Sequence, residues 1–274
     1  MTDNRIDGTN PPVVLAAETG EAETKPRLPV KVGWLLHKDA TSLLMFEPEQ
    51  VVPAPERMRS VEMSKVHAKS ASRCPAIINL ESRYFVVRCP YDIHLRFARD
   101  QNGVAALRDV AGPASPIRAN HIDKVVRLVK EVEWRYKDRP TLQIPTPYVF
   151  IADEPVYLNQ VPPFFHYLPN AWPGTLFGGR FPTHIWPRAL MWAFEWHDTS
   201  KDLILRRGDP WFYVNFEVVP QDRPVQLVEA QRTPELVSFM DSISGVTNYV
   251  NQTFSLFKEA ERRRPKRLLT PVAR

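Results

Sequence analysis

Glu195 and His197 are the two residues whose types and spacing most favour chemistry in this chain. They lie at the end of a run, 189–197, in which large apolar residues alternate with smaller or polar ones, and this period of two predicts a β-strand over 189–196. Successive side chains of a strand point to opposite faces, so Glu195 and His197 should share the face opposite the tryptophans. A carboxylate and an imidazole so placed can share a proton or a metal ion, which makes both residues candidate catalytic groups.

A second long strand, predicted over 211–219, should lie in the same sheet and bring Tyr213, Asn215 and Glu217 to the border of this pair. The simpler interpretation is a row of ordinary polar residues that faces solvent on a sheet buried on one side. The alternation of apolar and polar residues already predicts such a row without any function.

Two loop histidines extend the candidate site toward a metal centre. His166 and His184 could join His197 and a carboxylate, either Glu195 or Asp198, in the two-histidine, one-carboxylate arrangement of non-haem iron sites. The compact His-x-Asp or His-x-Glu pair typical of jelly-roll oxygenases is absent from this part of the sequence. Histidines beside aromatic residues are more often hydrogen-bonded packing residues than ligands. We therefore expect no metal site and keep an iron or zinc centre as the alternative.

The segment 145–216 is rich in aromatic residues and proline. It holds 17 of the 29 aromatic residues, five of the seven tryptophans and ten of the 27 prolines. Proline removes a backbone donor and disfavours long helices, so this segment should form the strand-and-turn core of the fold. Within it, 169–187 is rich in glycine and proline and predicts a long ordered loop.

Aromatic rings on this loop resemble the stacking platforms that bind sugars or nucleobases, and arginines beside them could hold an anionic ligand. The alternative is a loop whose rings are folded onto the sheet and buried. The candidate ligand-binding residues are Trp172, Arg180, Trp186, Arg188 and Tyr213.

The elements that must position these residues are mostly strands. Asn102-Gly103 supplies the positive φ angles of a tight hairpin between 92–99 and 104–110, and Thr233-Pro234 begins the first of two C-terminal helices. The segment 120–134 has helical spacing but β-branched residues, and fits helix and strand equally. The fold class is therefore α+β, mainly antiparallel β, a sandwich or jelly-roll-like fold with two C-terminal helices. Other strands are predicted over 30–36, 42–46, 76–80, 83–88, 147–151 and 156–158.

The chain divides into three parts by composition. Residues 1–27 are polar and predict a disordered leader. Residues 28–257 should form a single β-rich domain, in which 51–72 is an irregular surface excursion. Residues 258–274 form a basic tail. The tail alone accounts for the net charge of +5, so the body is electrically balanced and a poor match to a phosphate backbone. We expect the tail to extend into solvent. Binding of nucleic acid or an acidic partner is an alternative for the tail only.

No run approaches the roughly 18 apolar residues that span a bilayer, and the first residues lack the pattern of a signal peptide. The sequence thus predicts a soluble cytoplasmic protein with no membrane partner. Cys74 and Cys89 have no zinc-ligand spacing, so we expect two buried thiols, with a redox disulfide between them as the alternative.

Two short motifs, Leu142-Gln143-Ile144-Pro145-Thr146-Pro147-Tyr148 and Arg207-Gly208-Asp209-Pro210-Trp211, resemble an uncharacterised family of bacterial and phage proteins, a domain of unknown function. The resemblance covers most of the chain after residue 30 and implies a bacterial, intracellular protein, but no activity or cofactor. We therefore expect a β-rich protein that binds a small ligand or a protein partner through the aromatic loop. The alternative is a jelly-roll-like non-haem metal-dependent enzyme of the oxygenase type.

Overall fold

The computed structural model describes residues 27–37, 45–51, 73–112, 122–166, 168, 171–246 and 253–273. Its strands form three sheets, which we call A, B and C. Sheet A has the order β14 (Val225–Glu229), β1 (Val30–Leu36), β7 (Thr141–Ala152), β11 (Ala189–Trp196) and β9 (Gly174–Leu176), with β6 (Arg127–Leu128) also paired to β7. Sheet B has the order β10 (Gly179–Pro182), β8 (Tyr157–Val161), β13 (Pro210–Glu217), β3 (Tyr84–Arg88) and β2 (Glu49–Gln50). Sheet C has the order β12 (Leu203–Leu205), β4 (Ile93–Arg99) and β5 (Ala105–Asp109).

Sheets A and B enclose the main core between them, and sheet C contributes to the same core. In β7, Tyr148 and Phe150 point into this core, whereas Val149 and Ile151 point to the opposite face and pack against the C-terminal helices. Both faces of β7 are thus buried, which explains the uninterrupted apolar run over 147–152. The predicted α+β fold, mainly antiparallel β with two C-terminal helices, is confirmed; the pair β1 and β14 is parallel.

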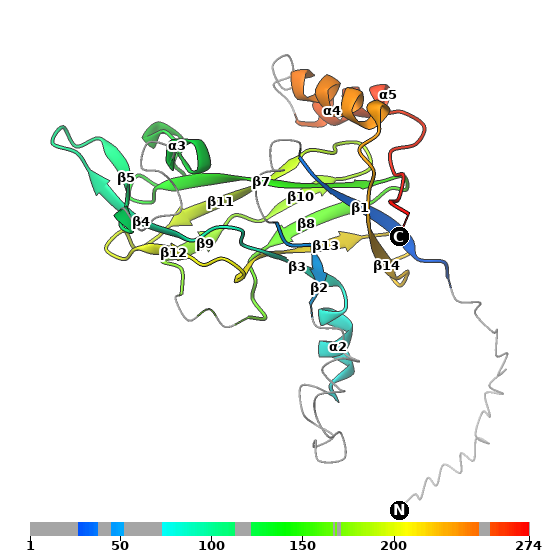
Figure 1. Ribbon diagram of the computed structural model, residues 1–274, viewed down its shortest axis with the longest axis horizontal. Coiled ribbons are helices and arrows are strands. Elements are labelled where there is room, and N and C mark those ends of the chain that lie inside the picture. Colours follow the sequence, from blue (N-terminus) through cyan, green and yellow to red (C-terminus); the bar gives the residue numbers. More distant parts are fainter. Residues whose placement is uncertain are drawn as a thin grey trace, which may run out of the picture.

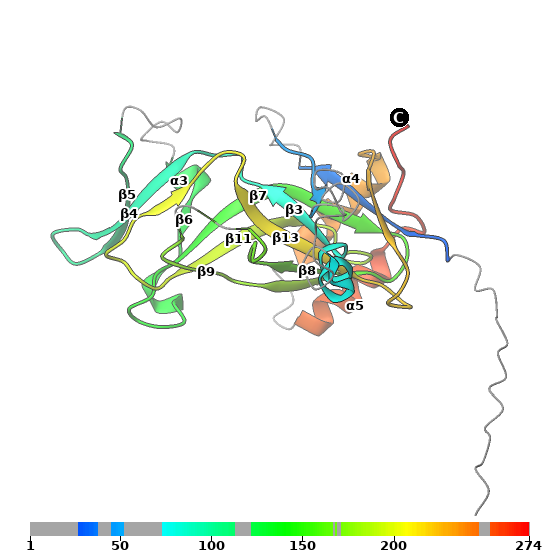
Figure 2. The same ribbon diagram turned by 90° about the horizontal axis from the view of Figure 1, so that it is seen from below.

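Helices α4 (Pro234–Val246) and α5 (Thr253–Arg263) lie together on one side of sheet A, and α2 (Pro75–Glu81) lies on the opposite side of the molecule beside β2 (Figures 1 and 2). The predicted cap of α4 is confirmed, because the Leu236 amide donates to Thr233 Oγ1 at 3.2 Å. Among the apolar residues of the two helices, Phe239 and Ala260 are buried against sheet A.

The C-terminal segment does not extend into solvent, and that prediction is wrong. Leu268 and Leu269 are buried, and their amides donate to Asp153 Oδ1 at 2.6 and 3.2 Å. The cations before them are also engaged: Arg262 and Arg263 pair with Glu259. The reason is that two leucines follow the charged run, and their burial docks the segment. The tail is therefore part of the folded body.

Of the other predictions about secondary structure, some are confirmed and others are wrong. The β4–β5 hairpin is confirmed, with Gly103 at a φ of 77°. The strand predicted over 76–80 is instead α2, which Pro75 starts in the first helical turn, where a proline is tolerated. The loop over 169–187 contains the two short strands β9 and β10. The ambiguous segment 120–134 resolves into the short helix α3 (Ile122–Val125), β6 and a 3₁₀ turn over Glu131–Glu133.

Some predictions lie wholly or largely outside the described residues, namely the leader, the excursion over 51–72 and most of the strand over 42–46. Within the described residues, no helix is both long and apolar enough to cross a membrane. Cys74 and Cys89 are free thiols, so the alternative disulfide is absent. Burial raises the pKa of the Cys89 thiol to about 12, which makes it inert at neutral pH.

Candidate functional site

The strand that carries Glu195 is confirmed as β11, and its tryptophans face the core. Trp192 and Trp196 are both 0% exposed. Glu195 projects from the other face of sheet A but is itself only 5% exposed. The interpretation of this face as a solvent-exposed polar row is therefore wrong for Glu195, although His197 next to it is exposed.

The Glu195 carboxylate has two cationic or polar neighbours. Its Oε1 lies 3.0 Å from His197 Nε2 and 3.6 Å from an Arg139 guanidinium nitrogen. The other oxygen, Oε2, is buried and has no hydrogen-bond partner among the described residues. The carboxylate can thus orient the exposed imidazole and anchor the turn that carries Arg139.

Strand β13 does not border this pair, because it belongs to sheet B rather than to the sheet of β11. The two strands face each other across the core instead, where the rings of Trp192 and Trp211 stack at 6.1 Å. Asn215 and Glu217 project from the outer face of sheet B, on the far side of the sandwich from Glu195. The prediction that they share one site is wrong.

The two loop histidines are held by other partners. The ring of His166 hydrogen-bonds the Tyr213 hydroxyl, and His184 Nδ1 lies 3.0 Å from the Val156 carbonyl oxygen. Burial lowers the pKa of His184, which favours its neutral form. Within the described ranges, no group of three or more His, Cys, Asp or Glu side chains could hold a metal ion. The alternative iron or zinc ligand set is therefore not brought together.

The aromatic loop is folded onto the sandwich rather than displayed. On the loop, Trp172 packs edge-on against Trp192 at 5.5 Å, and Trp186 is 5% exposed. Tyr213, which lies on β13, is fully buried. Arg188, which is exposed, lines a small pocket of about 270 Å³ beside α4, and the buried Trp186 also belongs to its lining. The rings named from the sequence are thus packing residues.

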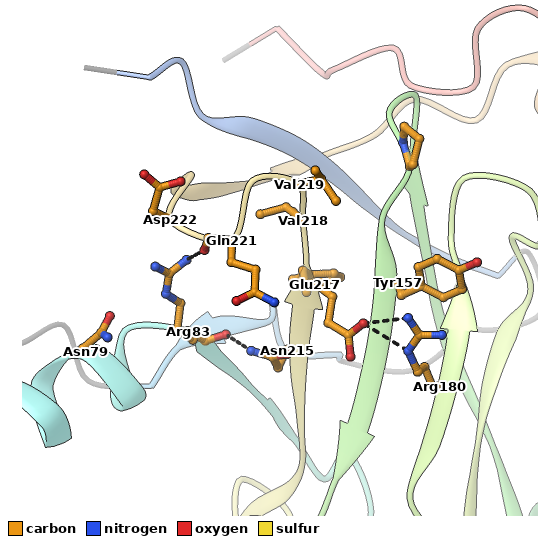
Figure 3. Close-up of a pocket in the computed structure, with 12 residues that line it drawn as sticks. Asn79, Arg83, Tyr157, Arg180, Asn215, Glu217, Val218, Val219, Gln221 and Asp222 are labelled. Carbon is orange, nitrogen blue, oxygen red and sulfur yellow. Dashed lines mark hydrogen bonds and ion pairs between the residues drawn. The ribbon is translucent and has the colours of Figure 1, made fainter. Parts of the chain in front are cut away.

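Arg180 lies elsewhere, in a groove on the outer face of sheet B that we call the sheet B groove (Figure 3). The groove has a volume of about 610 Å³ and lies between α2, strands β8, β10 and β13, and the turn that follows β13. Its lining residues are Asn79, Arg83, Pro155, Tyr157, Arg180, Asn215, Phe216, Glu217, Val218, Val219, Gln221 and Asp222.

One end of the sheet B groove is a fixed network around Glu217. Arg180 donates Nε and Nη2 to Glu217 Oε2 at 3.1 and 2.7 Å, while Asn159 donates to Oε1 at 2.7 Å. The Arg180 guanidinium also lies 3.8 Å from the centre of the Tyr157 ring. Both oxygens of Glu217 are therefore occupied, and the arginine is held by a carboxylate on one side and by a ring face on the other.

The other end of the groove is formed by Arg83. Its Nη1 donates to the carbonyl oxygens of Gln221 and Arg223 at 2.9 and 3.2 Å, and the residue has no carboxylate partner among the described residues. The side-chain amides of Asn79 and Gln221 line the same end and make no hydrogen bond within the described part of the chain. This end thus holds a positioned cation and two uncommitted amides.

The titration of Glu217 tests the network. Its pKa is lowered from the ordinary 4.5, chiefly by the hydrogen bonds from Arg180. The stabilisation from this pair is therefore present above pH 4.5 and lost as the pH falls through the lowered pKa of the folded state. We expect the Glu217 carboxyl carbon, followed by NMR, to titrate below 4.5 in the wild type and closer to 4.5 in Arg180→Gln. Arg108→Gln, which removes an exposed arginine on β5, is the control. Equal titration midpoints of Glu217 in the wild type and in both variants would contradict the network.

Little in the sequence points to this groove. The alternation of Tyr213, Asn215 and Glu217 along β13 is apparent in the sequence. Asn79 and Arg83, from α2 and the turn before β3, are instead far in the chain from Gln221, in the turn after β13. No spacing connects them, and only the packing of α2 and the turn beside β13 brings them together.

Comparisons of the chain with models of protein families, with curated protein sequences and with solved structures find no match. The resemblance of 142–148 and 207–211 to an uncharacterised bacterial and phage family stays a prediction. The function is therefore inferred from the geometry of the site.

Proposed function

We propose that this protein is a non-catalytic binding protein that holds a small polar ligand in the sheet B groove. The observation that carries the proposal is the groove of about 610 Å³ in which Arg83, Asn79 and Gln221 present polar groups that the described residues do not satisfy. Ligand sites are concave and combine apolar walls with a few polar groups that fix orientation. Val219, Pro155 and the Tyr157 ring supply apolar surface here.

Binding is favoured over catalysis because the only acids in the lining are engaged. Glu217 accepts hydrogen bonds from Arg180 and Asn159 on its two oxygens, and Asp222 pairs with Arg27. General-base catalysis needs a free carboxylate or imidazole within hydrogen-bond reach of the substrate proton that it removes. The metal-enzyme alternative has the pair of Glu195 and His197 in its favour, but this pair has no third ligand among the described residues.

A groove-filling substitution tests the proposal. In Figure 3 the Gln221 side chain lies between Arg83 and Glu217, so Gln221→Trp should occupy the groove without removing a hydrogen bond of that side chain. We would screen a panel of sugars, amino acids, nucleosides and di- and tricarboxylic acids by thermal shift. Compounds that raise the melting temperature of the wild type should lose that effect in Gln221→Trp.

Gln226→Trp is the matched control, because Gln226 is also an exposed glutamine but belongs to β14 and does not line the groove. It should respond to the panel like the wild type. A panel without any stabilising compound, or compounds that stabilise Gln221→Trp as much as the wild type, would overturn the proposal.

We further propose that the protein works in the cytoplasm of a bacterial cell. The two free cysteines support a reducing compartment, since secreted proteins of this size commonly use such residues in disulfides. The resemblance of the two short motifs supports a bacterial origin.

A further inference from the structure

We infer that the ligand of the sheet B groove carries an oxyanion, a carboxylate or a phosphate, which binds to Arg83. This inference rests on the proposed function and adds the chemical class of the ligand. It follows from the charges of the groove, from the hydrogen bonds that remain unmade, and from the way Arg83 is held.

When the charged residues that line the groove are paired, one cation remains without an anionic partner. The lining contains Arg83 and Arg180 against Glu217 and Asp222. Arg180 is paired with Glu217, and Asp222 is paired with Arg27, which lies outside the lining. Arg83 is the charged group of the lining that has no opposite charge as its partner among the described residues. A half-buried guanidinium without a counterion is a natural partner for an anion.

The orientation of Arg83 is fixed before any ligand arrives. Its Nη1 donates to two backbone carbonyls, those of Gln221 and Arg223, and its own carbonyl oxygen accepts from Asn215 Nδ2 at 3.2 Å. These contacts leave Nε and Nη2 for a ligand. A planar guanidinium with two free donors matches a carboxylate or a phosphate in a bidentate geometry, and its fixed position reduces the entropy lost on binding.

The amides beside Arg83 complete the subsite. Figure 3 shows Arg83 between the side chains of Asn79, from α2, and Gln221, from the turn after β13. Each amide group offers two N–H donors, and neither makes a hydrogen bond with a described residue. The end of the groove near Arg83 thus offers donors from three side chains, and the Asp222 carboxylate there is paired with Arg27. The acceptor oxygens of Glu217 at the other end are already used.

Simple anions test this inference directly. We would titrate the ¹⁵N-labelled full chain with sodium phosphate and, separately, with sodium citrate, and use sodium chloride at matched ionic strength as the reference. The side-chain Nε–H of Arg83 and the side-chain amide of Gln221 should shift saturably with phosphate, citrate or both, and not with chloride. The phosphate and citrate arms separate the two sources of the oxyanion.

Variants assign the effect to Arg83. Arg83→Gln should weaken anion binding at least about tenfold, as expected for the loss of charge-assisted hydrogen bonds. Because Arg83 also ties down the turn after β13, Asn79→Ala provides a second variant on an exposed side chain that makes no hydrogen bond; it should weaken anion binding while the fold is kept. Arg108→Gln, which removes an exposed arginine on β5, should bind like the wild type.

Two results would overturn the inference. One is the absence of any saturable shift at Arg83 with both anions, and the other is unchanged anion binding in a folded Arg83→Gln protein. If a neutral compound of the panel binds and Gln221→Trp abolishes that binding, the proposed function stands and only the inference of an oxyanion ligand fails. If neither a neutral compound nor an anion binds in the groove, both fail.

Discussion

Replacing Trp192 by alanine should lower the free energy of unfolding by about 3–5 kcal/mol, the cost typical of a tryptophan removed from a core. Trp192 is fully buried between sheets A and B. Its ring stacks on Phe194 at 5.2 Å and contacts the rings of Trp172 and Trp211. The cavity left by the indole would be lined by rings from both sheets, which cannot all move inward. Urea unfolding followed by circular dichroism measures the loss.

Val132→Ala is the control for this prediction, because Val132 is 91% exposed. Its effect should stay within about 0.5 kcal/mol. A second variant, Trp192→Phe, keeps an aromatic ring and should cost less than the alanine variant. If Trp192→Ala were no less stable than Val132→Ala, the tryptophan side of β11 would not face the core, and the sandwich architecture would be wrong.

Gly174→Ala should destabilise the protein by about 3 kcal/mol or more, at the upper end of the cost of overpacking. A Cβ atom on Gly174 would lie 2.0 Å from the backbone oxygen of Glu195 and 2.8 Å from a ring carbon of Phe194. The first contact is with backbone that is paired into β11, so it cannot be relieved by a side-chain rotation. We expect β9 to separate from β11, which hydrogen exchange at 174–176 would detect together with the loss in urea stability.

Gly178→Ala is the matched control in the same segment. There the nearest atom to an added Cβ would be the Gln160 carbonyl oxygen at 3.2 Å, a contact that a shift of a few tenths of an ångström relieves. The free energy of unfolding of this variant should fall by less than about 1 kcal/mol. Equal stability losses in the two variants would contradict the close approach of β9 to β11.

Much of the fold could be predicted from local sequence patterns. The alternation along 189–196, the Asn102-Gly103 turn and the Thr233-Pro234 helix start each depend on residues close together in the chain, and each is confirmed. The segment 76–80 predicts a strand but forms α2, because a short, mostly apolar segment fits either structure and length is the main criterion that separates them. The basic composition of 258–274 predicts a solvated tail, because composition does not show that Leu268 and Leu269 are buried.

The candidate site was far less predictable, because it depends on contacts between distant segments. Glu195 and His197 do lie together, as the period of two requires. Their expected neighbours Asn215 and Glu217 lie on the opposite outer face of the sandwich, since an alternating pattern shows which side chains share a face but not which strand pairs with which. The aromatic type of the loop residues by itself predicts ligand binding, whereas their packing against the sheet shows that Trp172 and Trp186 are packing residues.

By itself, the sequence determined the positions of most strands, the side of each strand that carries its apolar residues, and the two C-terminal helices, because these depend on periodicity and capping over a few residues. Only the tertiary structure decided that β11 and β13 belong to different sheets, that the basic end is docked by Leu268 and Leu269, and that Arg83, Asn79 and Gln221 meet in one groove. The physical reason is that strand pairing and segment docking are selected by the total burial of apolar surface across the whole chain, which no local pattern encodes.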